Sequence, residues 1–337
     1  MKRHHKAILA GTLIAAIAAL GVGQVAVEAS NARADAPIFE VDPFWPKPLP
    51  NNWVLGSAIG VGVDSRDHVF IIHRSSSTLN ARTEAGAEQD PPTGECCAGA
   101  PPILEFDPDG NLVNYWGGEP GQDYGQYVWP ESNHGITIDH MNNVWIGGNG
   151  PTDSHILKFS HDGRFIAQFG IPGQGAEPAS NSMQRFDGVA KISIDERANE
   201  AYVSDGYGNR RVAVLDMNTG AIKRYWGAYG NRPDDTNPGP YRPGQPPAPQ
   251  FRTPVHCAEP TNDGLVYVCD RPNNRVQVFR KDGTFVTEKI IAPNTLGDGA
   301  VWDIAFSRDP SQTYLYLADG KNMKVYILDR QTLEILT

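Results

Sequence analysis

The sequence lacks the features that mark two large classes of protein. Its 337 residues carry a net charge of −10, and no stripe of lysine and arginine runs through them, so we expect no nucleic-acid partner. After the N-terminus, no stretch shows a clear amphipathic helical period, which argues against a helical protein. Glycine (35) and proline (27) are abundant instead, as in chains made of short strands joined by tight turns.

Cysteine is scarce, with four residues in the whole chain. Cys257 and Cys269 fall on two predicted neighbouring antiparallel strands, where a cross-strand disulfide would fit. Cys96 and Cys97 are adjacent in a loop rich in glycine and proline, and they either form a strained ring, pair elsewhere or stay free. Disulfides of this kind are typical of an oxidising compartment.

A long hydrophobic run occurs only at the N-terminus. Residues 7–27 are apolar, a basic segment (1–6) precedes them, and Ala-x-Ala sites end at Ala34 and Ala36. This order predicts a signal peptide over residues 1–36 and an exported protein, periplasmic or extracellular. The alternative is an uncleaved anchor, because the run is about long enough to span a bilayer. Only in that case would the protein contact a membrane.

One strand–turn–strand phrase recurs five times after the N-terminus. The copies span residues 103–117, 156–170 and 212–227, and two more begin at Val276 and Val325. Asp-Gly pairs supply three of the turns, because glycine accepts the positive φ that a tight hairpin needs. A first hairpin precedes each copy, so each unit is a four-stranded antiparallel sheet that cannot bury both faces alone.

These units predict an all-β fold, a β-propeller of four-stranded antiparallel blades. Five complete blades are present, and we expect a six-bladed design whose last blade is missing; a five-bladed wheel is the alternative. Residues 37–52 form an N-terminal extension that would supply a blade-closing strand. Residues 53–337 form one propeller domain.

One column of the repeat carries histidines. When the first hairpins are aligned on Asp64, Asp139 and Asp195, the position five residues earlier faces the central channel. It holds Ile59, His134, Ala190, His256 and Trp302 in blades one to five. A third histidine in blade six would complete a three-histidine zinc site with open positions. The alternative is two channel-lining histidines hydrogen-bonded to water.

Two further residues stand at hairpin ends. Arg74 closes a blade-one strand, and Tyr207 follows a blade-three strand. If both face one cavity mouth, the arginine would lower the pKa of the phenol and make it a usable base. The alternative is a surface ion pair and a loop aromatic.

Four segments together carry a family resemblance: residues 70–74 (Phe-Ile-Ile-His-Arg), 134–139 (His-Gly-Ile-Thr-Ile-Asp), 204–210 (Ser-Asp-Gly-Tyr-Gly-Asn-Arg) and 254–256 (Pro-Val-His). The chain resembles NHL-repeat six-bladed propellers, and among them the peptidyl-α-hydroxyglycine α-amidating lyases. The resemblance implies the following roles: Arg74 and Tyr207 catalytic, His134 and His256 zinc ligands, and the backbone carbonyls of Val61 and Ile136 ligands of a structural calcium.

The resemblance also implies a reaction, the zinc-assisted cleavage of a C-terminal α-hydroxyglycine into an amide and glyoxylate. The family's third zinc histidine and the calcium-binding aspartate beside it belong to the sixth blade, and Gly208 stands where the family has a cysteine. We expect a small-molecule or peptide substrate and a monomer. The alternative function is a non-catalytic extracellular NHL-repeat propeller that binds a protein, peptide or glycan.

Overall fold

The computed structural model describes residues 36–75, 79, 97–175 and 178–337. The predicted signal peptide, apart from Ala36, and Cys96 lie outside these residues, so the predictions made for them are not assessed. Within the described residues no helix is long and apolar enough to cross a membrane. The chain divides into a larger compact unit, residues 42–304 and 318–324, and a smaller unit whose described residues are 36–41, 305–317 and 325–337.

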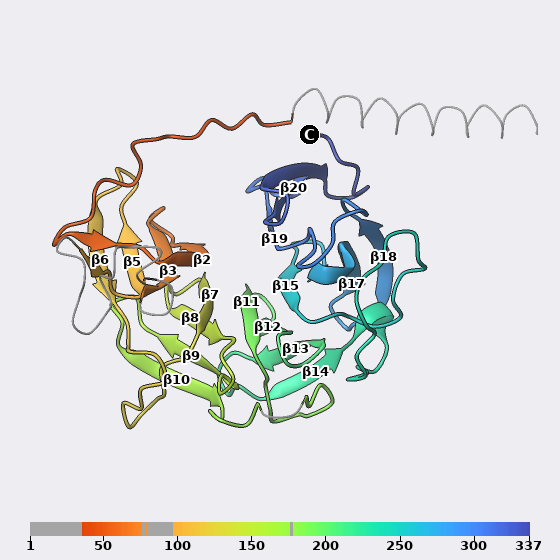
Figure 1. The fold of residues 1–337 in the computed structure, drawn as a ribbon, viewed down its shortest axis with the longest axis horizontal. Helices are drawn as coiled ribbons and strands as arrows, with labels where there is room; N and C mark the ends of the chain where they lie inside the picture. The colour runs from red at the N-terminus through yellow and green to blue at the C-terminus, as the bar shows by residue number, and fades with distance from the viewer. Residues whose placement is uncertain (1–35, 76–78, 80–96, 176–177) are drawn as a thin grey trace, which may run out of the picture. The chain divides into compact units, whose positions relative to one another are not determined.

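Four four-stranded sheets make up most of the larger unit, and neighbouring strands in each sheet are antiparallel. In chain order their strands are β2 (Ser57–Val63), β3 (Val69–Arg74), β5 (Ile103–Phe106) and β6 (Leu112–Trp116); β7 (Asn133–Ile138), β8 (Val144–Gly148), β9 (His155–Phe159) and β10 (Phe165–Gly170); β11 (Val189–Asp195), β12 (Glu200–Asp205), β13 (Arg211–Asp216) and β14 (Ile222–Trp226); β15 (Val255–Pro260), β16 (Leu265–Asp270), β17 (Arg275–Arg280) and β18 (Phe285–Ile290). Their first strands, β2, β7, β11 and β15, contact one another in order and lie innermost (Figure 1).

A fifth sheet follows in the chain. It contains β19 (Asp303–Phe306), β20 (Tyr314–Asp319) and β21 (Lys324–Asp329). Ile335 bridges to Leu328, so the end of the chain pairs along β21 in the place of a fourth strand. The prediction of an all-β propeller with five blades is confirmed, and the sixth blade stays a prediction.

The hydrophobic core lies between neighbouring blades rather than within them. One cluster joins Phe70 and Ile72 of blade one to Val144 and Ile146 of blade two. Two further clusters repeat this arrangement between blades two and three and between blades three and four. These clusters bury the faces of the sheets against the neighbouring blades, which is why the repeat forms a propeller.

The N-terminal extension contacts blade one. The Trp45 ring lies 5.7 Å from that of Phe106, and the Lys47 amide donates a hydrogen bond to the Gly110 carbonyl. Further along, β1 (Trp53–Val54) pairs in parallel with β4 (Ala98–Gly99). The blade-closing role expected of the extension stays a prediction.

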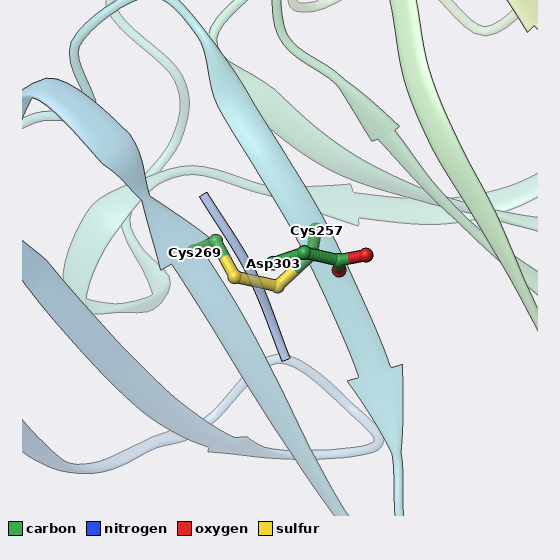
Figure 2. A group of neighbouring side chains, drawn as sticks. All are labelled: Cys257, Cys269 and Asp303. Carbon is green, nitrogen blue, oxygen red and sulfur yellow. A yellow bond between two sulfur atoms is a disulfide. The ribbon is translucent and has the colours of Figure 1, made fainter. Parts of the chain in front are cut away.

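The predicted disulfide between Cys257 and Cys269 is present (Figure 2). The two residues are direct partners across β15 and β16, with Cα atoms 4.8 Å apart. Asp303 lies beside this disulfide (Figure 2). Because both sulfur atoms are bonded to each other, they are not available to a metal ion.

Candidate functional site

The innermost strands of the blades share a bulge near their start. The pairing register shifts between residues 58 and 60 in β2, between residues 189 and 191 in β11, and between residues 255 and 257 in β15. The bulged residues are therefore Ile59, Ala190 and His256. A bulge re-aims a side chain that a regular strand would place on one face of the sheet. The bulges coincide with the channel-facing column predicted from the sequence.

In β7 the corresponding shift falls at Gly135, directly after His134. Gly135 has a φ of +64°, and a Cβ there would collide with the carbonyl oxygen of Ala190. Glycine is therefore required for β7 to approach β11 this closely. The same approach brings the His134 ring to Ala190.

The two histidine rings are held in one tautomer by backbone carbonyls. Nδ1 of His134 donates to the carbonyl of Ala190 at 2.7 Å, and Nδ1 of His256 donates to that of Trp302 at 2.5 Å. With the proton on Nδ1, each Nε2 carries a free lone pair. The ring centroids lie 5.1 Å apart.

Both imidazoles are neutral at physiological pH. Burial lowers the pKa of His134 to about 3, and the neighbouring His256 lowers it further. Burial also lowers the pKa of His256 to about 3, with the Arg271 charge adding to the shift. Neutral imidazole is the form that binds a metal ion.

Tyr207 joins the two histidines. Its hydroxyl oxygen lies 3.0 Å from Nε2 of His134 and 3.1 Å from Nε2 of His256. A phenol carries one proton, so it can donate to only one of these two acceptors. The other lone pair faces the phenol oxygen without a proton between them.

This donor set fits a zinc ion. Two neutral imidazoles whose Nδ1–H groups are bound by carbonyls are oriented as metal-binding histidines usually are, and their Nε2 atoms converge on one oxygen. Trp302 holds the column position in blade five, with its ring centroid 6.1 Å from that of His256. In the described residues the column thus offers two histidines.

The loop that carries Tyr207 is anchored to the segment before β11. The Tyr207 amide donates to the Gly188 carbonyl, and the Gly208 amide donates to that of Asp187. A Cβ at Gly188, whose φ is +70°, would clash with the Tyr207 Cβ. A Cβ at Gly208 would collide with the Asp187 carboxyl group. The cysteine expected by resemblance at residue 208 is thus excluded by the position of Asp187.

Arg74 lies near Tyr207, at the end of β3. Its Nη2 donates to Oδ1 of Asn149 at 2.7 Å, and its Nε donates to the carbonyl of Asn133 at 3.4 Å. Burial lowers the pKa of the Arg74 guanidinium, and the Tyr207 phenol and Asp153 oppose that shift. The structure therefore brings all four predicted site residues, Arg74, His134, Tyr207 and His256, into one region; their roles stay predictions.

Arg271 is a residue that the sequence analysis missed. Its Nη1 donates to the Tyr207 hydroxyl oxygen at 3.2 Å, and its guanidinium lies 4.7 Å from the Trp302 ring centroid. Arg271 directly follows β16, as Tyr207 follows the end of β12 after one glycine. Arg74 and Tyr207 were selected because they stand at hairpin ends. The same criterion would have identified Arg271.

A cavity of about 590 Å³ begins at Arg271. Arg210 and Arg252 also line it, together with Tyr241 and the proline-rich segment 237–240. Its acidic lining residue, Asp298, is paired with Lys321 at 3.3 Å. The cavity thus has three guanidinium groups at its wall in a protein of net negative charge, which favours an anionic ligand.

A smaller cavity of about 30 Å³ lies between the innermost strands. His134 and His256 line it, and so do Val61 and Ile136, the residues expected to offer carbonyls to calcium. Lys191 and Asp303 complete the wall on another side. Burial acts to lower the pKa of the Lys191 ammonium, but Asp303 and Glu259 together raise this pKa above its usual value.

A second group of metal-type side chains lies between blades one and two. It comprises Asp64, Glu105 and His161. The Arg66 guanidinium fills the space among them: its Nη2 lies 3.1 Å from Asp64, 3.2 Å from Glu105 and 2.7 Å from His161. A fixed cation therefore already occupies this group.

The fold is a β-propeller, and a histidine–tyrosine cluster lies between its innermost strands. The NHL repeat model matches residues 261–279, which cover β16 and most of β17. The chain is similar both to an NHL repeat-containing protein and to peptidyl-glycine alpha-amidating monooxygenases.

Two relatives are similar over most of this chain. NHL repeat-containing protein 3 of Mus musculus is 25% identical over 308 residues, which cover 90% of this chain and 71% of that protein. Peptidyl-glycine alpha-amidating monooxygenase B of Xenopus laevis is 26% identical over 253 residues, or 74% of this chain. The chain spans 25% of the length of that monooxygenase. A solved streptogramin B lyase has a TM-score of 0.48 at 12% identity, over 85% of this chain and 83% of that one, a likeness too slight to carry an argument.

Proposed function

We propose that the protein is an exported, zinc-dependent lyase that cleaves a C-terminal α-hydroxyglycine into an amide and glyoxylate. The observation that carries this proposal is the Tyr207 hydroxyl, which lies within hydrogen-bond distance of two unprotonated Nε2 atoms, at 3.0 and 3.1 Å. A base and two metal-type ligands thus converge on one point. The similarity to amidating monooxygenases over 74% of this chain supports the same assignment.

His134 and His256 would hold the zinc through Nε2. When bound there, zinc supplies Lewis acidity that polarises the hydroxyl group of the substrate. The backbone carbonyls of Ala190 and Trp302 keep both rings in the ligating tautomer. We expect weak binding to this chain, because two histidines are one fewer than the three protein ligands of most catalytic zinc sites.

Tyr207 acts as the base of the cleavage. As phenolate, its oxygen takes the proton of the substrate α-hydroxyl group. The electron pair of that O–H bond forms the carbonyl of glyoxylate, and the pair of the C–N bond leaves with the nitrogen. The nitrogen then takes the proton from the Tyr207 hydroxyl and becomes the primary amide, which restores the phenolate, so atoms and electrons balance.

Arginines orient the substrate beside this base. Arg271 donates a hydrogen bond to the Tyr207 oxygen, an interaction that strengthens when the oxygen carries negative charge. Its place at the wall of the 590 Å³ cavity also suits it to bind the carboxylate of the α-hydroxyglycine. Arg74, near Tyr207, adds a second positive charge.

The second candidate is a non-catalytic propeller that binds a protein, peptide or glycan outside the cell. Trp302 favours it, because an indole rather than a further metal ligand holds the blade-five position of the column, beside His256. The alignment with NHL repeat-containing protein 3, which covers more of this chain than that with the monooxygenases, also agrees with it.

One assay separates the two candidates. The purified protein is supplied with zinc and incubated with a peptide that ends in α-hydroxyglycine, and glyoxylate and peptide amide are measured. Equal amounts of both products support the lyase. Absence of both from a folded, zinc-loaded protein leaves the binding module.

A further inference from the structure

Three charged side chains from consecutive blades meet in the channel. Nζ of Lys191, on β11, lies 2.8 and 3.0 Å from the two carboxylate oxygens of Asp303, on β19. It also lies 2.8 Å from Oε1 of Glu259, on β15. The Lys191 side chain is 19% exposed and that of Glu259 17%, so this pair is largely shielded from water, whereas the Asp303 side chain is 46% exposed.

The group occupies a fixed place in the repeat. Lys191 and Asp303 each come directly after a column residue, Ala190 and Trp302. Asp303 therefore stands beside the column position of its blade, as Lys191 does in blade three. In this chain its carboxylate faces an ammonium.

The same cavity contains the backbone positions expected to bind calcium. Val61, Ile136, Lys191 and Asp303 all line the cavity of about 30 Å³. A calcium ion there would lie against the Lys191 ammonium, and two cations in so small a space repel strongly. The residues present therefore do not fit calcium.

We propose that the Lys191 ammonium replaces a structural divalent cation in the channel, and that its removal turns Asp303 and Glu259 into a calcium site. The ammonium neutralises the two carboxylates and joins β11 to Glu259 on β15 and to Asp303. Without it, two carboxylates face a space that had held a cation within 3.0 Å of three of their oxygen atoms. Calcium prefers such oxygen ligands at 2.3–2.6 Å, which a small movement of the side chains provides.

The test is thermal unfolding of the full chain with calcium and with a chelator. The unfolding temperature of the wild type is expected to be the same in both, whereas Lys191→Met is expected to be less stable in chelator and to gain at least about 3 °C with calcium. Lys191→Arg keeps the positive charge, so its unfolding temperature should be the same with calcium and with chelator. The added substitution Asp303→Asn should abolish the gain.

Lys281→Met is the matched control. Nζ of Lys281 is paired with Oδ2 of Asp195 at 2.5 Å, but Lys281 does not line the channel cavity. This variant should be destabilised without any response to calcium. A general effect of calcium on exposed carboxylates would instead stabilise both lysine variants.

In the thermal test, either calcium stabilisation of the wild type or a folded Lys191→Met that calcium leaves unchanged would overturn the proposal. If Lys191→Met folds only with calcium, the proposal stands. If it folds in neither condition, Lys191→Gln takes its place, and terbium luminescence excited through Trp302 is measured on the wild type. Terbium bound to the wild type and lost on Asp303→Asn would also overturn the proposal. None of these readings depends on catalytic activity.

Discussion

Nε2 of His256 lies 3.1 Å from the hydroxyl oxygen of Tyr207, although the two residues belong to different blades. The contact depends on two local devices. A bulge turns His256 toward the channel, and Gly188 allows the Tyr207 loop to pack against the segment before β11. The site is thus built by the edges of blades, where each innermost strand meets its neighbour.

His134→Ala removes one of the two proposed zinc ligands. We expect it to weaken zinc binding at least about a hundredfold, because one protein ligand is too few to hold the ion. Zinc is measured by titration and by metal analysis of the purified protein. His140→Ala is the control. The His140 side chain is 38% exposed, and its Nδ1 lies 3.9 Å from a carboxylate oxygen of the exposed Glu196. Equal zinc affinity in both variants would rule out the histidine pair as the site.

Arg271→Met removes the hydrogen bond to the Tyr207 oxygen and one of the positive charges that line the larger cavity. We expect a decrease in kcat of about a hundredfold, as for the loss of one donor to a developing negative charge. Arg232→Met, which breaks a hydrogen bond to Asn181 at an exposed site, should leave kcat unchanged. A variant with normal kcat and KM would show that Arg271 only packs against Trp302.

Asp187→Asn tests the buried carboxyl group under the Tyr207 loop. Burial raises the pKa of Asp187 to about 6, and Asp205 raises it further. Because the folded pKa is higher than the unfolded one, the stability linked to its proton is present at low pH and is lost as pH rises through about 6. The variant should therefore gain about 1–2 kcal/mol in unfolding free energy at pH 8 relative to wild type, after allowance for solvent screening.

At pH values below about 4 the difference between Asp187→Asn and wild type should vanish, because both side chains are then neutral. Urea unfolding at several pH values measures it. A stability difference that stays constant with pH would mean that Asp187 is not the group whose proton is linked to folding.

Reduction of the Cys257–Cys269 disulfide is expected to cost about 2–3 kcal/mol of stability, since it opens a short loop between residues separated by 12 positions. The double variant Cys257→Ala/Cys269→Ala gives the same loss without reductant. Denaturant unfolding of both should agree. A double variant as stable as wild type would mean that the packing of β15 on β16 alone holds this hairpin.

Much of the fold was predictable, because a recurring strand–turn–strand phrase reports a blade wherever it occurs. Aligning these phrases also placed His134 and His256 in one column, and the structure brings their rings within 5.1 Å. Tyr207 and Arg74 were found through their positions at hairpin ends.

Other parts of the site could not be read from the pattern. Arg271 was missed because its role depends on the direction of a long side chain across a blade boundary, which no spacing encodes. The Lys191 pairing was missed because alternation indicates which face a residue occupies, but not which charge lies opposite on the next blade. The need for glycine at residue 208 became clear only from the position of the Asp187 carboxyl group, which leaves no room for a Cβ.

The most direct test of the proposed lyase is glyoxylate release from an α-hydroxyglycine peptide by the zinc-loaded wild type and by Tyr207→Phe, with Tyr115→Phe as the control at an exposed ring. We expect release by the wild type and the control, a loss of at least about a hundredfold in Tyr207→Phe, and equal zinc content in all three. No glyoxylate from the wild type, or undiminished release by Tyr207→Phe, would contradict the assignment.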